Sequence, residues 1–204
     1  DMAQYKPSPL NGFDLFNYMA LIVCARARDY AEITFHKFAD ELEAKDAAGQ
    51  YAFGAPENEK HRVTWEGIAV WTYLGATFKG LKNQGAVMTG SAYPGLWSLV
   101  YTPGDLESMA EAYTNVYINT CGPNRYEEFY KVVKNSKSDG IVLHLNRSCK
   151  LMGLLNNEGA EYVNAKLGVP YVSFDGDQTD PRVFTPAQYE TRVQALTEMM
   201  DENQ

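Results

Sequence analysis

The stretch Asp139-Gly140-Ile141-Val142-Leu143-His144-Leu145-Asn146-Arg147-Ser148-Cys149-Lys150 decides the fold. Its apolar first half predicts a buried β-strand, and the polar residues after it predict a turn into a helix. At the start of that helix, Cys149 would feel the positive end of the helix dipole and the cations Arg147 and Lys150, which favour the thiolate. Because thiolates ligate metals and attack electrophiles, Cys149 is a candidate metal ligand or reactive thiol. The alternative is a small buried residue that packs under the sheet.

Around this stretch the chain alternates between expected strands and helices. Strands are expected at residues 62–65, 86–89, 140–145 and 170–174, and helices at 11–46, 69–82, 105–115, 126–134, 150–167 and from Thr185 onward. Short strands separated by helices predict a parallel sheet with helices on both faces, for which the simplest strand order is 2-1-3-4. Ligands in such sheets bind at the carboxyl ends of the strands, where the order reverses. The loops there are Glu66-Gly67 and Asn146-Arg147-Ser148-Cys149, so the fold argument also selects Cys149.

Three helix ends carry recognisable signals. Asn11 is expected to cap the first helix, and Gly168 to end the helix that follows Cys149. Thr185 precedes Pro186, and Gln188 stands where it would complete a capping box with Thr185. The final helix is therefore expected to begin at Pro186.

The composition is that of a globular protein. The chain has 204 residues, of which 45% are hydrophobic and 22% charged. Its net charge of −8 and pI of about 4.9 argue against nucleic acid as a partner, because phosphate binding needs a basic surface. No apolar run approaches the ~20 residues of a membrane-spanning helix, and no signal-peptide pattern stands at the start. We expect that Asp1 is not a native start.

The three cysteines are too widely and irregularly spaced to predict a disulfide framework. They are Cys24, Cys121 and Cys149. We therefore expect a reducing, cytoplasmic location and structural roles for Cys24 and Cys121.

Two other residues near the predicted strand ends are candidates for proton transfer. Glu66 could act as a general base or bind a substrate amide, and the alternative is a carboxylate at a helix start. His144 could donate to a ligand or shuttle a proton, and the alternative is a core histidine bonded to backbone. His36 and His61 have no constellation around them.

Asp175 and Asp177 resemble a carboxylate pair for a divalent cation, but Asp-Gly-Asp is also ordinary turn chemistry, which we favour. No glycine-rich phosphate loop and no G-x-S-x-G elbow is present. The sequence therefore supports neither a nucleotide site nor a serine hydrolase.

Longer runs of the chain resemble the 2-hydroxyacyl-CoA dehydratase family nearly end to end. The signature runs are His144–Lys150, Val172–Arg182 and Gln188–Leu196, and the runs Tyr5–Asn17 and Arg62–Ile68 resemble the alpha-type subunit in particular. The family resemblance implies a flavodoxin-like or Rossmann-like four-stranded parallel sheet. Residues 47–60 have the composition of a loop and mark an expected boundary. We therefore expect a helical linker segment, 1–58, and an α/β domain, 59–204, which by the resemblance would bind cluster and substrate.

The resemblance also implies an activity. Enzymes of this family are oxygen-sensitive heterodimers of anaerobic amino-acid fermentation, and each subunit carries a 4Fe-4S cluster. An ATP-hydrolysing iron–sulfur activator delivers one electron. The acyl-CoA substrate, an (R)-2-hydroxyacyl-CoA, then forms a ketyl radical and loses water in a syn-type elimination to give an (E)-2-enoyl-CoA.

Among the cluster ligands of the family, only Cys149 carries over by motif. The other two cysteine ligands are expected from an N-terminal half that is absent here, so the chain looks like the C-terminal half of an alpha-type subunit. Asn146, Arg147, Ser148 and Lys150 are expected to surround the cluster or substrate. The amide and hydroxyl would donate to cluster sulfurs, and the two cations would offset the charges of thiolates and CoA phosphates.

Several alternatives stay open at this point. The family resemblance also extends to ATP-dependent aromatic (benzoyl) acyl-CoA reductases, which share the cluster and the activator. The chain could instead be a non-catalytic docking or half-site module, or a redox carrier that uses Cys149. The acyl group is not determined: lactoyl, 2-hydroxyglutaryl, 2-hydroxyisocaproyl and phenyllactyl groups are all candidates.

Overall fold

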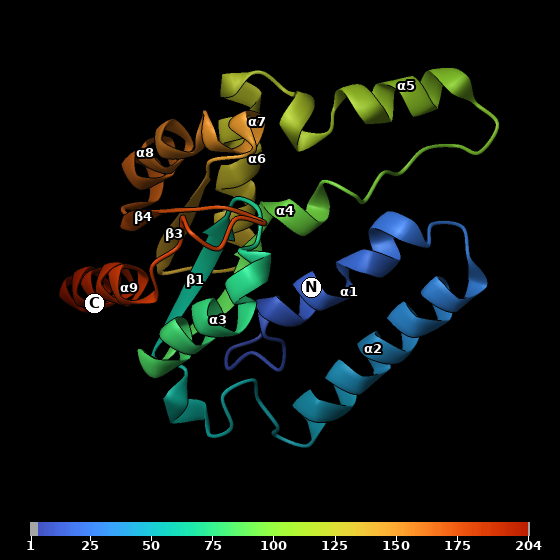
Figure 1. Cartoon of the computed structure of the whole chain (residues 1–204). Helices are drawn as coiled ribbons and strands as arrows, with labels where there is room; N and C mark the ends of the chain where they lie inside the picture. Colours follow the sequence, from blue (N-terminus) through green and yellow to red (C-terminus); the bar gives the residue numbers. More distant parts are fainter. Residues whose placement is uncertain (1–3, 204) are drawn as a thin grey trace.

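The computed structural model describes residues 4–203, and its centre is a four-stranded sheet in which all strands are parallel. The strands are β1 (His61–Glu66), β2 (Ala86–Ser91), β3 (Gly140–Asn146) and β4 (Tyr171–Gly176). Their spatial order is β2-β1-β3-β4, which confirms the predicted order and the α/β class (Figure 1). Because parallel strands end at a common edge, the loops after β1 and β3 lie together there.

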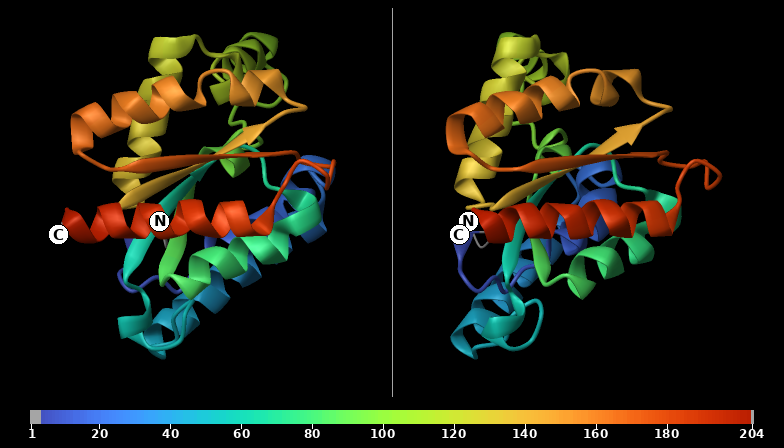
Figure 2. Two further views of the ribbon diagram at one scale, coloured as in Figure 1. Left: turned by 60° about the vertical axis from the view of Figure 1, so that its left-hand side comes forward. Right: turned by 90° about the vertical axis from the view of Figure 1, so that its left-hand side faces the viewer.

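Helices cover both faces of the sheet, as Figure 2 shows. One core contains side chains of α1 (Gly12–Cys24), α3 (Leu74–Asn83) and α9 (Pro186–Glu202), and the other contains those of α6 (Gly122–Asn135) and α8 (Asn156–Leu167). Successive side chains of a strand point to opposite faces. Trp65 of β1 enters the first core, where its ring centroid lies 5.8 Å from that of Phe13 in α1. Leu143 of β3 enters the second core.

The remaining helical segments lie around this centre. They are α2 (Asp29–Ala47), η2 (Pro56–Asn58), η3 (Trp71–Tyr73), α4 (Ala92–Gly95), α5 (Leu106–Thr114), η4 (Tyr117–Asn119) and α7 (Lys150–Gly153). α2 packs against α1, with the ring centroids of Tyr18 and Phe38 4.4 Å apart. Figure 1 shows α5 standing away from the sheet, on a segment that leaves after α4 and returns at α6. No helix within residues 4–203 is both long and apolar enough to cross a membrane.

Two of the predicted helices are divided in the structure. Residues 11–46 form α1 and α2, and residues 25–28 between them contain no glycine or proline to signal the break. Residues 150–167 form α7 and α8, with α7 ending at Gly153. An isolated glycine in a helical pattern weakens the helix, and this one marks a true end.

The predicted helix ends have mixed outcomes. The Asn11 side chain accepts a hydrogen bond from the Phe13 N–H at 3.3 Å, which confirms this cap. Gly168 has a φ of 71° and ends α8 as predicted. Thr185 does precede the first residue of α9, but its side chain makes no capping hydrogen bond, so the predicted capping box is wrong.

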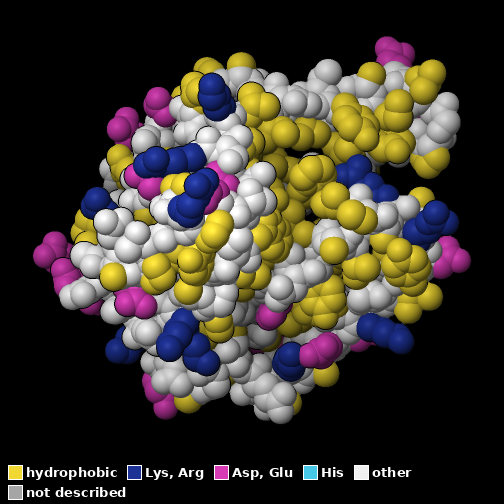
Figure 3. Space-filling view, in the orientation of Figure 1, with side chains coloured by type: hydrophobic (Ala, Val, Ile, Leu, Met, Phe, Trp, Pro, Cys, Tyr) yellow, Lys and Arg dark blue, Asp and Glu magenta, His cyan; other side chains and the backbone are white. Residues whose placement is uncertain are grey.

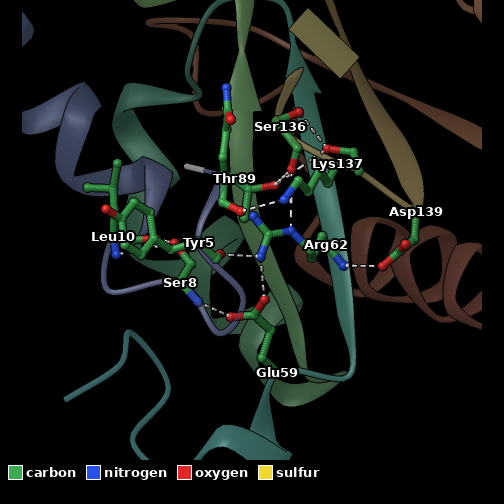
Figure 4. A network of polar contacts seen from close by, with 11 residues as sticks. Tyr5, Ser8, Leu10, Glu59, Arg62, Thr89, Ser136, Lys137 and Asp139 are labelled. Atoms are coloured by element: carbon green, nitrogen blue, oxygen red, sulfur yellow. Dashed lines mark hydrogen bonds and ion pairs between the residues drawn. The ribbon is translucent and has the colours of Figure 1, made fainter. Parts of the chain in front are cut away.

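The face of β1 that lies toward α6 is polar although it is buried. The side chains on this face come from every second position of the strand, and they are Arg62, Thr64 and Glu66. Figure 4 shows the network around Arg62, which donates 2.7 Å hydrogen bonds to the Tyr5 carbonyl and to Glu59 and a 3.3 Å bond to the Ser136 carbonyl. These contacts fix the segment before α1 and the end of α6 onto β1. At the other end of this polar face, Glu66 reaches the carboxyl edge of the sheet.

Candidate functional site

Cys149 lies at the carboxyl edge of the sheet, where the strand order reverses between β1 and β3. It is the N-cap residue of α7, and its half-buried side chain packs against the core that contains Trp65. Tyr93 of α4 is close by: burial raises the pKa of its hydroxyl, and the charge of Cys149 adds to this effect. The structure therefore places Cys149 where the strand pattern predicted it.

The helix that follows Cys149 is shorter than predicted. α7 has four residues, and the Cys149 side chain makes no capping hydrogen bond. Because the macrodipole is a sum over aligned peptide units, one helical turn contributes little of it. The predicted single helix from residue 150 to 167 is therefore wrong, and Cys149 precedes one helical turn.

The two cations beside Cys149 point to the surface. Arg147 and Lys150 are exposed, and the Arg147 guanidinium lies 3.5 Å from the carboxylate of Asp175. Both cations line a hollow of about 250 Å³ together with Asn146 and Asp175. Cationic and amide groups at the edge of an open hollow form a surface that suits an anionic ligand.

The polar side chains of the turn are already bonded to the loop after β4. The Asn146 side-chain amide donates to the Gln178 side chain at 3.2 Å, and its Oδ1 accepts hydrogen bonds from the backbone N–H groups of Ser148 and Gln178. The Ser148 hydroxyl donates to Oδ2 of Asp177. Since a serine has one hydroxyl proton, this bond leaves none for an external acceptor.

Asp175 and Asp177 do not form a carboxylate pair. Asp175 is exposed, whereas Oδ1 of Asp177 accepts 2.9 Å bonds from the N–H groups of Thr179 and Asp180. The hydrogen bonds from Ser148 and from these backbone groups hold the pKa of Asp177 well below its ordinary value. The turn interpretation is confirmed. Within residues 4–203, no group of three or more His, Cys, Asp or Glu side chains is arranged to hold a metal ion.

Glu66 is the last residue of β1 and is 1% exposed, so it is not the helix-starting carboxylate of the alternative interpretation. Its Oε1 accepts a 2.7 Å hydrogen bond from the Tyr117 hydroxyl and lies 3.9 Å from Nη2 of Arg125. Its Oε2 has no hydrogen-bond partner among the described residues. Burial raises the pKa of Glu66 to about 7, although both neighbours lower it.

Tyr117 and Arg125 are site residues that the sequence reasoning missed. Arg125 is 3% exposed, lies in the first turn of α6, and its guanidinium stands 4.7 Å from the centroid of the Tyr117 ring. Tyr117 also lines a cavity of about 510 Å³ beside α4, α5 and α6. The sequence did contain a signal for the place of Arg125. Pro123 favours the first turn of a helix, so it would have moved the predicted helix start from residue 126 to 122 and placed Arg125 in the first turn.

His144 is a core residue. It is 0% exposed, its Nδ1 bonds the Ile68 carbonyl, and its ring stacks on Phe174 at 5.1 Å. Burial lowers the pKa of His144. His36 and His61 each face one carboxylate, at 3.8 and 3.3 Å. Cys24 and Cys121 are exposed free thiols at helix ends.

Hydrophobic side chains gather on one face of the molecule, between α5 and the pair α1 and α2 (Figure 3). A groove of about 740 Å³ lies between residues 97–103 and the region where α1 leads into α2. Val100 and Leu106 on the neighbouring segment are 90% and 76% exposed. Contiguous exposed apolar surface of this kind is typical of protein–protein or membrane interaction sites and of ligand-binding grooves.

Comparisons with known proteins agree with the sequence resemblance. The family model described as 2-hydroxyglutaryl-CoA dehydratase, D-component, matches residues 1–200. Lactoyl-CoA dehydratase subunit alpha of Anaerotignum propionicum is 62% identical over 205 residues, which is 100% of this chain and 48% of that protein. The (R)-2-hydroxyisocaproyl-CoA dehydratase alpha subunit of Clostridioides difficile is 44% identical over 200 residues, 98% of this chain and 48% of that protein.

A more distant relative belongs to another enzyme class. A benzoyl-CoA reductase subunit of Thauera aromatica is 23% identical over 213 residues, 99% of this chain and 49% of that protein. The chain thus spans about half the length of each of these relatives.

Proposed function

This chain belongs to the 2-hydroxyglutaryl-CoA dehydratase D-component family, and on that premise we propose that it is part of an alpha-type 2-hydroxyacyl-CoA dehydratase subunit. The observation that carries the proposal is the 62% identity to a lactoyl-CoA dehydratase alpha subunit across the whole chain. The reaction is removal of water from an (R)-2-hydroxyacyl-CoA to give an (E)-2-enoyl-CoA. It proceeds through a ketyl radical of the substrate after one-electron activation by an ATP-dependent iron–sulfur partner.

Cys149 fits as one ligand of a 4Fe-4S cluster. Its thiol is half-buried, lies at the carboxyl edge of the sheet and belongs to a turn that hydrogen bonds hold in place. The described residues form no group of three or more His, Cys, Asp or Glu side chains that could hold a metal ion. In this proposal the other two cysteine ligands belong to residues outside this chain. When bound, such a cluster supplies one-electron chemistry and a Lewis-acidic iron.

The exposed residues beside Cys149 are suited to the anionic part of the substrate. Arg147 and Lys150 border the 250 Å³ hollow and would attract the phosphates of an acyl-CoA. Asn146 and Ser148 shape the turn through their bonds to Gln178 and Asp177. We assign the four residues to the surroundings of the cluster and substrate in these two different roles.

Glu66 and His144 act within the protein in this proposal. Both are buried at 1% or less exposure, and neither lines the 250 Å³ hollow bordered by Arg147 and Lys150. Glu66 is the counter-charge of Arg125, and His144 is a packed core group.

Partners follow from the relatives, which are subunits of larger enzymes. A second dehydratase subunit and an activator are part of the proposal, as is a cytoplasmic location, where thiols stay reduced. The exposed apolar surface near Val100 and Leu106 supports an assembly with further polypeptide.

The test is made on the native protein purified without oxygen. Iron, acid-labile sulfide and intact mass are measured for wild type, C149A and the control variants C24A and C121A. We expect about four irons per subunit in wild type and both controls, and loss of iron in C149A. Formation of an enoyl-CoA from (R)-lactoyl-CoA, with activator and ATP, is then measured. Full iron content in C149A would contradict the proposal.

The reductase alternative rests on the 23% identity to the benzoyl-CoA reductase subunit. Product analysis separates the two reactions, because dehydration has no net electron demand and ring reduction consumes reductant in proportion to product. A protein of 22.9 kDa that holds no iron would instead favour the non-catalytic module.

A further inference from the structure

The Cys149 segment, residues 147–153, is held on its first side by the loop after β4. The Ser148 hydroxyl donates to Asp177, and Asp177 is itself fixed by the N–H groups of Thr179 and Asp180. The Asp177 side chain is 2% exposed. Several donors orient the Asp177 carboxylate, so the exposed Ser148, directly before Cys149, has a fixed hydrogen-bond partner.

The same segment is held on its other side by Arg125 of α6. Nη1 of Arg125 donates to the Leu151 carbonyl at 2.6 Å, and Nη2 donates to the Met152 carbonyl at 3.3 Å. Carbonyls in the last turn of a helix have no partner within it, and α7 is little more than one turn. Arg125 thus provides partners that α7 cannot provide for itself.

Arg125 is in turn fixed by its own neighbours. It donates to the Asn156 side chain at 3.2 Å, stacks on Tyr117 and faces the carboxylate of Glu66. A guanidinium buried to this degree requires a counter-charge and several acceptors, and these three residues supply them. The planar fork of arginine can serve two carbonyls and an amide at once, which a lysine ammonium cannot do in the same geometry.

We propose that Arg125 and Asp177 are positioning residues for Cys149, because they hold the Cys149 segment from its two sides and so fix the place of the thiol. This inference rests on the proposed function for its biological meaning. Both residues are separated from Cys149 in sequence, and both act on it through the backbone and side chain of its neighbours. Their role is to present the thiolate in one geometry to whatever it binds.

The test measures how fast iodoacetamide alkylates Cys149 in the folded 204-residue chain, by peptide mass spectrometry. Cys24 and Cys121 are exposed and serve as internal references in the same molecules. The test variants are S148A, which removes the bond to Asp177, and R125K, which keeps the charge but not the fork. S148T restores the hydroxyl and is the conservative rescue.

Two control variants remove exposed ion pairs on the same elements without touching the Cys149 segment. K131Q breaks the pair with Glu128 on α6, and R182Q breaks the pair with Asp180 in the loop after β4. Circular dichroism checks the fold of every variant. Hydrogen exchange of the amides of residues 149–154 is the second measurement.

We expect the alkylation rate of Cys149 to rise about five- to tenfold in S148A and R125K, since each loses hydrogen bonds that oppose local opening of the segment. S148T and both controls should match wild type, and the two reference thiols should not change. A Cys149 rate within about twofold of wild type in S148A, with unchanged amide exchange, would overturn the proposal. If R125K does not fold, the S148A and S148T pair still decides whether Asp177 positions the thiol.

The outcome is independent of the proposed function. If C149A keeps its iron, the function proposal fails, and the alkylation rates still decide whether Arg125 and Asp177 position the thiol. If C149A loses its iron and the alkylation rates stay equal, the positioning proposal alone fails.

Discussion

Tyr117 donates a 2.7 Å hydrogen bond to Oε1 of Glu66, a carboxylate that is otherwise enclosed by protein at the carboxyl end of β1. The bond connects residues 51 positions apart in the chain. Arg125 contacts both residues of the pair and also bonds the Leu151 carbonyl, so this arrangement links η4, α6 and β1 to the Cys149 segment. The ionisation of Glu66 is therefore coupled to the stability of this region.

The pH dependence of stability should reveal Glu66. Burial raises its pKa from 4.5 to about 7, so the folded protein keeps a proton that the unfolded chain has lost between these values. The contribution of protonated Glu66 to stability is present below pH 4.5 and is lost as the pH rises through about 7.

We expect E66Q to keep its stability as the pH rises through about 7, since the glutamine side chain stays neutral. The free energy of unfolding of E66Q minus that of wild type should rise by up to about 3 kcal/mol over this pH range. Urea unfolding at intervals of pH measures the difference, and parallel curves for the two proteins would refute the assignment.

Arg62 should be among the most costly side chains to remove. It is 0% exposed and bonds Glu59, the Tyr5 carbonyl and the Ser136 carbonyl. R62M leaves Glu59 buried without its counter-charge, and we expect a loss of about 3–5 kcal/mol in the free energy of unfolding. The double variant R62M/E59M should recover part of it, and a double-mutant cycle with no coupling would contradict this account.

Two glycines with positive φ provide a matched pair of substitutions. Gly67 has a φ of 103°, and a Cβ added there would lie 2.5 Å from the His144 carbonyl oxygen, whereas Gly168 has a φ of 71° with nothing within 4 Å. G168A should cost about 1 kcal/mol, the penalty of the left-handed conformation alone. G67A should cost at least about twice as much, because backbone must also shift. Equal losses in denaturant unfolding would mean that the loop after β1 is more pliable than its packing indicates.

Substrate affinity should respond in opposite directions to the two members of an exposed ion pair. If Arg147 attracts the phosphates of acyl-CoA, R147Q should raise KM about five- to tenfold with little change in kcat. D175N removes the carboxylate that lies 3.5 Å from Arg147 and should lower KM. Steady-state kinetics of the assembled enzyme measure both, and an unchanged KM in R147Q would exclude this role.

The strand order and the place of Cys149 followed from the sequence because both depend on local patterns. Apolar runs that end in polar turns marked the four strands, and their alternation with helices limited the sheet to a few topologies. The turn chemistry of Asp177 was also readable, since Asx turns form between near neighbours. The division of α1 from α2 was not readable, because residues 25–28 contain none of the residues that usually punctuate a helix.

Only the tertiary structure decided what surrounds Cys149. Arg125 bonds the Leu151 carbonyl from 26 residues away, and Ser148 bonds Asp177 from 29 residues away. No periodicity records such pairs, because they arise when α6 and the loop after β4 pack at the ends of β1 and β3. Local patterns along the chain were enough to predict the sheet and the position of the thiol in it. The packing of helices on that sheet determined which buried charges meet and how the thiol is held, because those contacts join residues that local pattern cannot relate.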